Sequence, residues 1–175
     1  MEENMSLKIF ESLVPSMACN TIIEEGKSRP QLDAGIGQTN TKSVGRSTQV
    51  TFIHNEFTKS FIYELVRTHY KNYVIEEAED LQFATYNKGD FYGPHFDADE
   101  TNGRILSVSV QLSKPSEYKG GDLCVYGIGG APTPLTNAQG SVIIFPSDML
   151  HEVEPVTKGT RYSLVQWFKG YESSN

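Results

Sequence analysis

A histidine and an aspartate stand two residues apart in a β-rich stretch of the chain, at His95 and Asp97. Side chains at positions i and i+2 of a strand face the same side of a sheet, so this imidazole and carboxylate converge on one point. His151 opens a later β-rich run, from which a sandwich can return it to the first strand. The pattern therefore favours a metal site at His95, Asp97 and His151. The alternative is a hydrogen-bonded pair at the surface.

Arg161 follows His151 in the strand-like run RYSLVQWF and has no acidic neighbour at i+2 or i+4. A guanidinium that points into an apolar interior needs a carboxylate or phosphate partner. Two imidazoles and one carboxylate leave open positions on a metal, as in non-haem Fe(II) oxygenases. An inward Arg161 would then hold an anionic co-substrate whose other end binds the metal. The alternative places Arg161 on the solvent face of an edge strand.

Composition limits the classes of protein that this chain can be. It has 175 residues, 38% of them hydrophobic, which suits a single domain over residues 1–175. A formal charge of -7 is opposite in sign to that of a nucleic-acid binder. No apolar run approaches the roughly 20 residues of a membrane span, and the N-terminus has no export signal. We expect a cytoplasmic protein that binds neither nucleic acid nor membranes.

Two segments in the first half have helical periodicity. The first is 15–27, where Ser16 can cap the helix, Met17 lies on its apolar side with two isoleucines, and Gly26 suits its end. The second begins at Asn55 as N-cap and ends near Lys71. Its apolar side is predicted from Phe57, Phe61, Ile62, Leu65, Val66 and His69. Between the helices, the glycines and polar residues of 29–48 predict a long loop.

From residue 81 onward the chain consists of short β-rich runs separated by turn residues. We predict eight strands, which suggest a sandwich or jelly roll. Helices followed by strands indicate an α+β fold, with helical support over about 1–75 and a β-core over about 81–169. The runs are LQFATY, FYGPHFD, ILSVSVQLS, DLCVYG, a stretch around TPLT, SVIIFP, LHEVEPV and RYSLVQWF.

Further residues can be assigned within this frame. Gln111 shares a face with two serines, and it lines the co-substrate pocket only if that face points inward. Asp148 either caps the turn before His151 or supports that histidine as a hydrogen-bond acceptor. Gly120 and Gly121 are expected to form a tight turn or bulge. Asp99 and Glu100 are expected in a solvated turn.

Four motifs in a fixed order carry a family resemblance, which covers residues 81–169 closely. They are Tyr86-x-x-Gly89-x-x-Tyr92-x-x-His95-x-Asp97, the GGDL turn at Gly120 to Leu123, GSVIIFPSDMLHEV at Gly140 to Val153, and Gly159-Thr160-Arg161-Tyr162.

This series resembles the 2-oxoglutarate and Fe(II)-dependent dioxygenases of the prolyl 4-hydroxylase type. The resemblance implies a double-stranded β-helix with iron on His95, Asp97 and His151, and with the distal carboxylate of 2-oxoglutarate on Arg161. Tyr86 matches a tyrosine that hydrogen-bonds the co-substrate, and Trp167 matches an aromatic residue close to the iron. Collagen-type enzymes usually carry Lys where Arg161 stands, which argues against a collagen-like substrate.

The reaction that this resemblance implies is hydroxylation of a prolyl residue in a peptide or protein. It uses Fe(II), O2 and 2-oxoglutarate, with ascorbate as a further candidate cofactor, and it releases succinate and CO2. Two alternatives stay open. One is a related oxygenase acting on a free amino acid or other small molecule, and the other is a non-catalytic β-sandwich that binds a small ligand. Related enzymes place a lid over the peptide where 29–48 stands here; the alternative for this segment is a disordered surface excursion.

Overall fold

A computed structural model describes residues 7–34, 45–127 and 129–173, which contain two helices and many short strands. In chain order these are β1 Lys8–Phe10, α1 Ser16–Lys27, β2 Leu32–Asp33, β3 Arg46–Ser47, β4 Gln49–Ile53, α2 Glu56–His69, β5 Tyr73–Ala78, β6 Leu81–Tyr86, β7 Phe91–His95, β8 Arg104–Gln111, β9 Tyr118–Gly120, β10 Leu123–Tyr126, β11 Pro132–Pro134, β12 Val142–Pro146, β13 His151–Val153, β14 Val156–Gly159 and β15 Arg161–Glu172.

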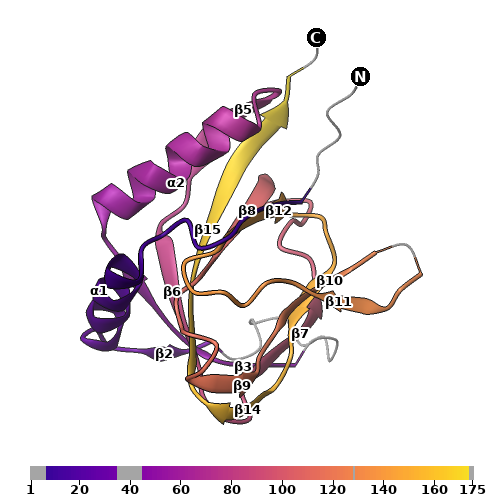
Figure 1. The fold of residues 1–175 in the computed structure, drawn as a ribbon. Helices are drawn as coiled ribbons and strands as arrows, with labels where there is room; N and C mark the ends of the chain where they lie inside the picture. Colours follow the sequence, from indigo (N-terminus) through magenta and orange to yellow (C-terminus); the bar gives the residue numbers. More distant parts are fainter. Residues whose placement is uncertain (1–6, 35–44, 128, 174–175) are drawn as a thin grey trace.

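The strands form two principal antiparallel sheets. The larger has the order β1-β12-β8-β15-β6-β4-β2, with β5 also paired to β15, and the smaller has the order β11-β10-β13-β7-β3. The strands β9 and β14 make a separate pair. In Figure 1 the smaller sheet lies on one side of the larger sheet and the two helices lie on the other. The predicted α+β class with a double-stranded β-helix core is confirmed.

The central strand β8 is buried on both faces, which is why its alternation reads so clearly in the sequence. Leu106, Val108 and Val110 belong to the apolar cluster that includes Ile62 and Val66 of α2. The intervening residues of β8 are buried polar side chains that face the space between the two sheets. One strand therefore contributes both to the core under the helices and to the polar interior.

Helix α1 occupies the predicted segment, but three details differ. Pro15 holds the N-cap position without any side-chain cap, so Ser16 is not the cap. Met17 is 82% exposed and lies off the apolar side. Gly26 does not end the helix but lies inside its last turn, where a Cβ would stand 2.5 Å from ring atoms of Phe83. This glycine permits close packing of helix and sheet.

Helix α2 begins as predicted, because the Asn55 side chain accepts a hydrogen bond from the Thr58 backbone N–H at 2.9 Å. Ile62 and Val66 are buried against the sheet. Phe57, predicted on the same side, is 82% exposed. At about 100° per residue, position 57 lies on the side of the helix opposite Ile62 and Val66. Neither helix of the described part is long and apolar enough to cross a membrane.

The segment 29–48 contains a short strand near each of its two ends. Leu32–Asp33 pairs with β4 and Arg46–Ser47 pairs with β7, so the prediction of a plain loop is wrong there. Two-residue strands are too short for alternation to reveal them in a sequence. Residues 35–44, which include Lys42, lie outside the described part of the chain. The region over 1–75 is also less purely helical than predicted, because β1 and β4 join the large sheet.

The two turn assignments are confirmed. Gly120 and Gly121 both have φ of 68°, in the left-handed region that favours glycine. A Cβ on Gly120 would collide with the Pro155 carbonyl oxygen. The Asp99 carboxylate accepts hydrogen bonds from the backbone N–H groups of Thr101 and Asn102, which is a local turn contact at the surface.

We expect the substitution Gly26→Ala to destabilise the protein. Alanine gains about 1 kcal/mol of helix propensity, but its Cβ overlaps the Phe83 ring, and overpacking of this kind costs about 1–3 kcal/mol. The free energy of unfolding in urea should therefore fall. Gly127→Ala is the control, because no atom beyond its chain neighbours lies within 4 Å of that Cβ. Equal stability of Gly26→Ala and the parent would contradict this account of the packing.

Candidate metal centre and active site

Two neighbouring strands of the smaller sheet bring the histidines together. His95 ends β7 and His151 begins β13, and the two residues are direct partners in the antiparallel pair. Their ring centroids are 4.2 Å apart. Asp97 lies just beyond β7, where its backbone N–H donates to the Ser147 carbonyl at 2.9 Å. This bond draws the chain across the end of the cavity and places the carboxylate beside both rings.

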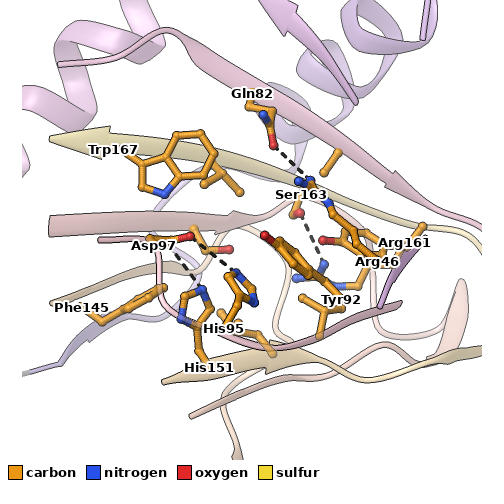
Figure 2. A pocket seen from close by; sticks show the side chains of 16 residues that line it. Arg46, Gln82, Tyr92, His95, Asp97, Phe145, His151, Arg161, Ser163 and Trp167 are labelled. Atoms are coloured by element: carbon orange, nitrogen blue, oxygen red, sulfur yellow. Dashed lines mark hydrogen bonds and ion pairs between the residues drawn. The ribbon is translucent and has the colours of Figure 1, made fainter. Parts of the chain in front are cut away.

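The three side chains form a compact group of possible metal ligands. The His95 Nε2 lies 3.5 Å from the Asp97 Oδ1, and the His151 Nε2 lies 3.4 Å from the Asp97 Oδ2. All three candidate ligand atoms lie within 4.8 Å of one another. Figure 2 shows the carboxylate and the two imidazoles converging on one point. The predicted grouping of His95, Asp97 and His151 is confirmed.

Each imidazole is held in the orientation that metal binding requires. The Nδ1 of His95 lies 2.8 Å from the Gly93 carbonyl, and the Nδ1 of His151 lies 2.8 Å from the Met149 carbonyl. Carbonyl oxygens only accept, so each Nδ1 carries the proton and each Nε2 can present its lone pair to a cation. Asp148 is exposed on the turn, so it is the Met149 backbone rather than this carboxylate that supports His151.

The Asp97 carboxylate is ionised inside the protein. Its side chain is only 8% exposed, and burial on its own raises the pKa. The neighbouring His151 and His95 rings and the Ser107 hydroxyl outweigh burial and hold the pKa of Asp97 well below its usual range. The Ser107 Oγ donates to the Asp97 Oδ2 at 2.7 Å and lies 2.9 Å from the Ser147 Oγ. Two imidazoles and one fixed carboxylate fit a divalent metal such as iron.

Arg161 faces the same cavity as the metal ligands. It begins β15 directly opposite Tyr86 of β6, and it is only 2% exposed. Its Nη1 donates to the Ser163 Oγ at 3.4 Å, and no carboxylate of the described residues forms an ion pair with it. The prediction that it points inward is confirmed. A buried guanidinium without an anionic partner suits a ligand that brings a carboxylate.

Tyr86 and Trp167 also line the cavity. Burial raises the pKa of Tyr86, so its phenol stays neutral and can donate a hydrogen bond. The Trp167 Nε1 is buried and has no hydrogen-bond partner among the described residues. Arg104 stacks on the indole at 4.0 Å and forms a two-bond ion pair with Glu79, at 2.8 and 2.7 Å. These contacts fix the indole at the wall of the cavity.

Gln111 lies behind the cavity wall rather than on it. The inward face of β8 does carry Ser107, Ser109 and Gln111, but only Ser109 of these three lines the cavity. The Gln111 Nε2 donates to the Tyr118 hydroxyl at 2.9 Å. Gln111 therefore lies on the inward face of β8 and contacts a neighbouring tyrosine, and its role in co-substrate binding stays a prediction.

Sequence reasoning missed several residues of the cavity wall, among them Tyr92 and Arg46. Tyr92 stacks on the His95 ring, with centroids 3.5 Å apart and planes at 11°. Arg46 lies over the other face of Tyr92 at 4.3 Å and donates to Gln82 at 3.3 Å. The spacing of Tyr92 and His95 in the first motif was a signal for Tyr92. Arg46 gave none, because it stands on a two-residue strand far away in the sequence.

Removing the Ser107 hydroxyl should weaken metal binding without unfolding the protein. In Ser107→Ala the Asp97 carboxylate loses its shortest hydrogen bond, and losses around metal ligands of this kind typically cost about 10–100-fold in affinity. Calorimetric titration with Mn(II) measures the effect. Ser109→Ala, two positions along the same face, should bind Mn(II) like the parent. Identical affinities for both variants would mean that the hydroxyl does not position Asp97.

Comparisons with known proteins agree with this geometry. Residues 81–169 match the model of the 2OG-Fe(II) oxygenase superfamily. A PKHD-type hydroxylase of Prochlorococcus marinus is 34% identical over 155 residues, which is 87% of this chain and 68% of that protein. Other PKHD-type hydroxylases match over 38% to 58% of their length, so the chain spans only part of them.

Solved structures share the fold. A Pseudomonas putida prolyl-4-hydroxylase aligns with a TM-score of 0.78 at 20% identity, over 96% of this chain and 94% of that one. A Trichoplax adhaerens prolyl hydroxylase, in complex with a peptide fragment of the hypoxia inducible factor oxygen degradation domain, also gives 0.78, at 17% identity over 95% and 84%. The match over 81–169, the metal group and the buried arginine together place the chain in the 2OG-Fe(II) oxygenase superfamily.

Proposed function

We propose that the chain hydroxylates a prolyl residue of a peptide or protein, using iron, O2 and 2-oxoglutarate. The observation that carries the proposal is the position of Arg161, a buried guanidinium with no ion pair among the described residues, in the same cavity as the group of His95, Asp97 and His151. A metal face and a guanidinium in one cavity fit the two ends of 2-oxoglutarate.

The residues that line the cavity have separate roles in binding and in orientation. His95, Asp97 and His151 would hold the iron, which when bound supplies the oxidative chemistry that couples conversion of 2-oxoglutarate to succinate and CO2 with C–H hydroxylation. Arg161 would hold the distal carboxylate, with Tyr86 as a neutral donor beside it. The remaining wall excludes water from the complex, which strengthens these electrostatic contacts. Its apolar part is formed by Ala84, Leu123, Phe145, Val153 and Val165.

A peptide or protein substrate is supported by the relatives rather than by the cavity alone. The curated relatives are PKHD-type hydroxylases, and the Trichoplax adhaerens neighbour was solved with a peptide in place. The Trp167 indole has an unused N–H at the wall of the metal cavity. A peptide carbonyl is an acceptor that fits this donor.

The proposal is tested with a panel of proline-containing peptides, incubated with Fe(II), ascorbate and 2-oxoglutarate. Mass spectrometry should find a gain of one oxygen on proline, in step with succinate release. His151→Ala should abolish both signals while keeping the fold, because a ligand is lost. Full turnover by His151→Ala would refute the metal assignment, and oxygen gain only on a free amino acid would refute the peptide substrate.

Arg161 provides a separate prediction about the co-substrate. Arg161→Lys keeps the charge but loses the paired donors, so the KM for 2-oxoglutarate should rise about tenfold with some activity left. Arg161→Ala should be at least 100-fold worse, because one partner of a buried charge pair is removed at a cost of about 3–5 kcal/mol. Steady-state succinate production measures both. The same KM in both variants and the parent would remove Arg161 from co-substrate binding.

A further inference from the structure

A second arginine, Arg46, reaches the metal cavity from the edge strand β3. It is the strand partner of Tyr92 in β7, and its guanidinium lies 4.3 Å over the Tyr92 ring. Tyr92 stacks in turn on the metal-ligand candidate His95, with centroids 3.5 Å apart. Guanidinium, phenol and imidazole thus form a stack that ends at the metal group (Figure 2). Arg46 is therefore held in a fixed place relative to the proposed iron.

Part of the Arg46 guanidinium forms no hydrogen bond with the described residues. The Arg46 Nη2 donates to the Gln82 Oε1 at 3.3 Å, but the buried Nε has no hydrogen-bond partner among the described residues. Arg46 lines the metal cavity, so its guanidinium borders the space that a ligand would enter. A buried N–H donor without an acceptor is rare in folded proteins and indicates a missing partner.

No acidic side chain of the described residues pairs with Arg46. Asp33 and Asp90 line a second, polar cavity that Arg46 also borders, but each has its own partner. Asp33 accepts from Gln49 at 3.3 Å, and Asp90 accepts from the Asn87 backbone N–H at 2.8 Å. The sequence of residues 35–44, GIGQTNTKSV, contains no Asp or Glu.

Charge balance in the cavity points the same way. A divalent iron and Arg161 carry the positive charge that Asp97 and a doubly charged 2-oxoglutarate cancel. Arg46 then leaves one positive charge on the wall of the cavity. Arg46 is half-buried, so water screens its charge only in part and an anion beside it would stabilise the complete complex.

We propose that Arg46 binds a carboxylate of the substrate, so that the hydroxylated proline is flanked by an acidic residue. This inference rests on the proposed prolyl hydroxylation. The full Tyr92 ring separates Arg46 from His95, with spacings of 4.3 and 3.5 Å. Together these exceed the distance between neighbouring Cα atoms, about 3.8 Å. The separation therefore fits a side chain one residue away better than the carboxylate of the reacting proline itself.

The chain contains a built-in probe of cavity occupancy. Trp167 is the single tryptophan of the sequence, and it lines the cavity. Protein loaded with 2-oxoglutarate and Zn(II), in place of iron, is titrated with blocked peptides while tryptophan fluorescence is recorded. The probes are two matched pairs, acetyl-Asp-Pro-Gly-amide with its Asn counterpart and acetyl-Gly-Pro-Asp-amide with its Asn counterpart. L-proline and L-prolinamide form a third pair.

We expect the Asp member of at least one peptide pair to bind about tenfold more tightly than the Asn member, as for a lost charge-assisted contact. Arg46→Gln should abolish this difference, and Arg46→Lys should keep part of it. The control Arg67→Gln removes the same charge from the exposed face of α2 and should keep the full preference. Unchanged Zn(II) affinity in all variants shows that the metal group is intact.

Three outcomes would overturn the inference. The first is that no peptide pair shows a preference, whether both members bind alike or neither binds. The second is a preference for the Asp peptide that persists in Arg46→Gln. The third is a preference confined to L-proline over L-prolinamide. The proposed function fails differently, because it is measured as oxygen gain with Fe(II). Acid-selective binding without hydroxylation would contradict prolyl hydroxylation and leave the Arg46 contact standing.

Discussion

The register between β7 and β13 is the constraint on which the rest of the cavity depends. It sets His95 directly opposite His151, and the bend after β7 adds the Asp97 carboxylate at 3.5 and 3.4 Å from the two Nε2 atoms. Such a group is favourable inside a protein only when a cation sits among the ligands or a proton is shared between them. Backbone carbonyls commit both Nδ1 atoms, so the Nε2 atoms are left facing the carboxylate. The fold therefore places groups that can bind a cation around a single point.

The core and the cavity lie on opposite faces of the same strands, of which β8 is one, and this ties stability to chemistry. The apolar residues of β8 pack under the helices, while Ser107 on its other face holds Asp97. Close approach of α1 to the sheet, permitted by Gly26 above Phe83, brings the helical layer onto the same sheet. Close packing on both faces of β8 restricts the movement of the side chains that hold Asp97 in place.

The sequence predicted the metal group and Arg161 well, because those residues follow local rules. An i, i+2 pair fixes a common face, and an arginine with no nearby acid indicates an inward position. It predicted less where position depends on distant partners. Arg46 owes its place to pairing with Tyr92 across 46 positions of sequence, and Phe57 faces solvent although its neighbours suggested otherwise. The His151 ring is supported by the Met149 carbonyl and not by Asp148. No sequence motif predicts such a contact, because every residue has a backbone carbonyl.

The strand β15 carries Arg161 at its start and Trp167 six residues later, both on the cavity side. With a rise of about 3.3 Å per residue, the strand separates the two residues by roughly 20 Å. Insertion or deletion of one residue within this span would turn every following side chain to the opposite face. The indole would then exchange places with a core phenylalanine. The cavity side of this span can therefore change by substitution along β15, whereas insertions and deletions are tolerated only in the turns around the strand.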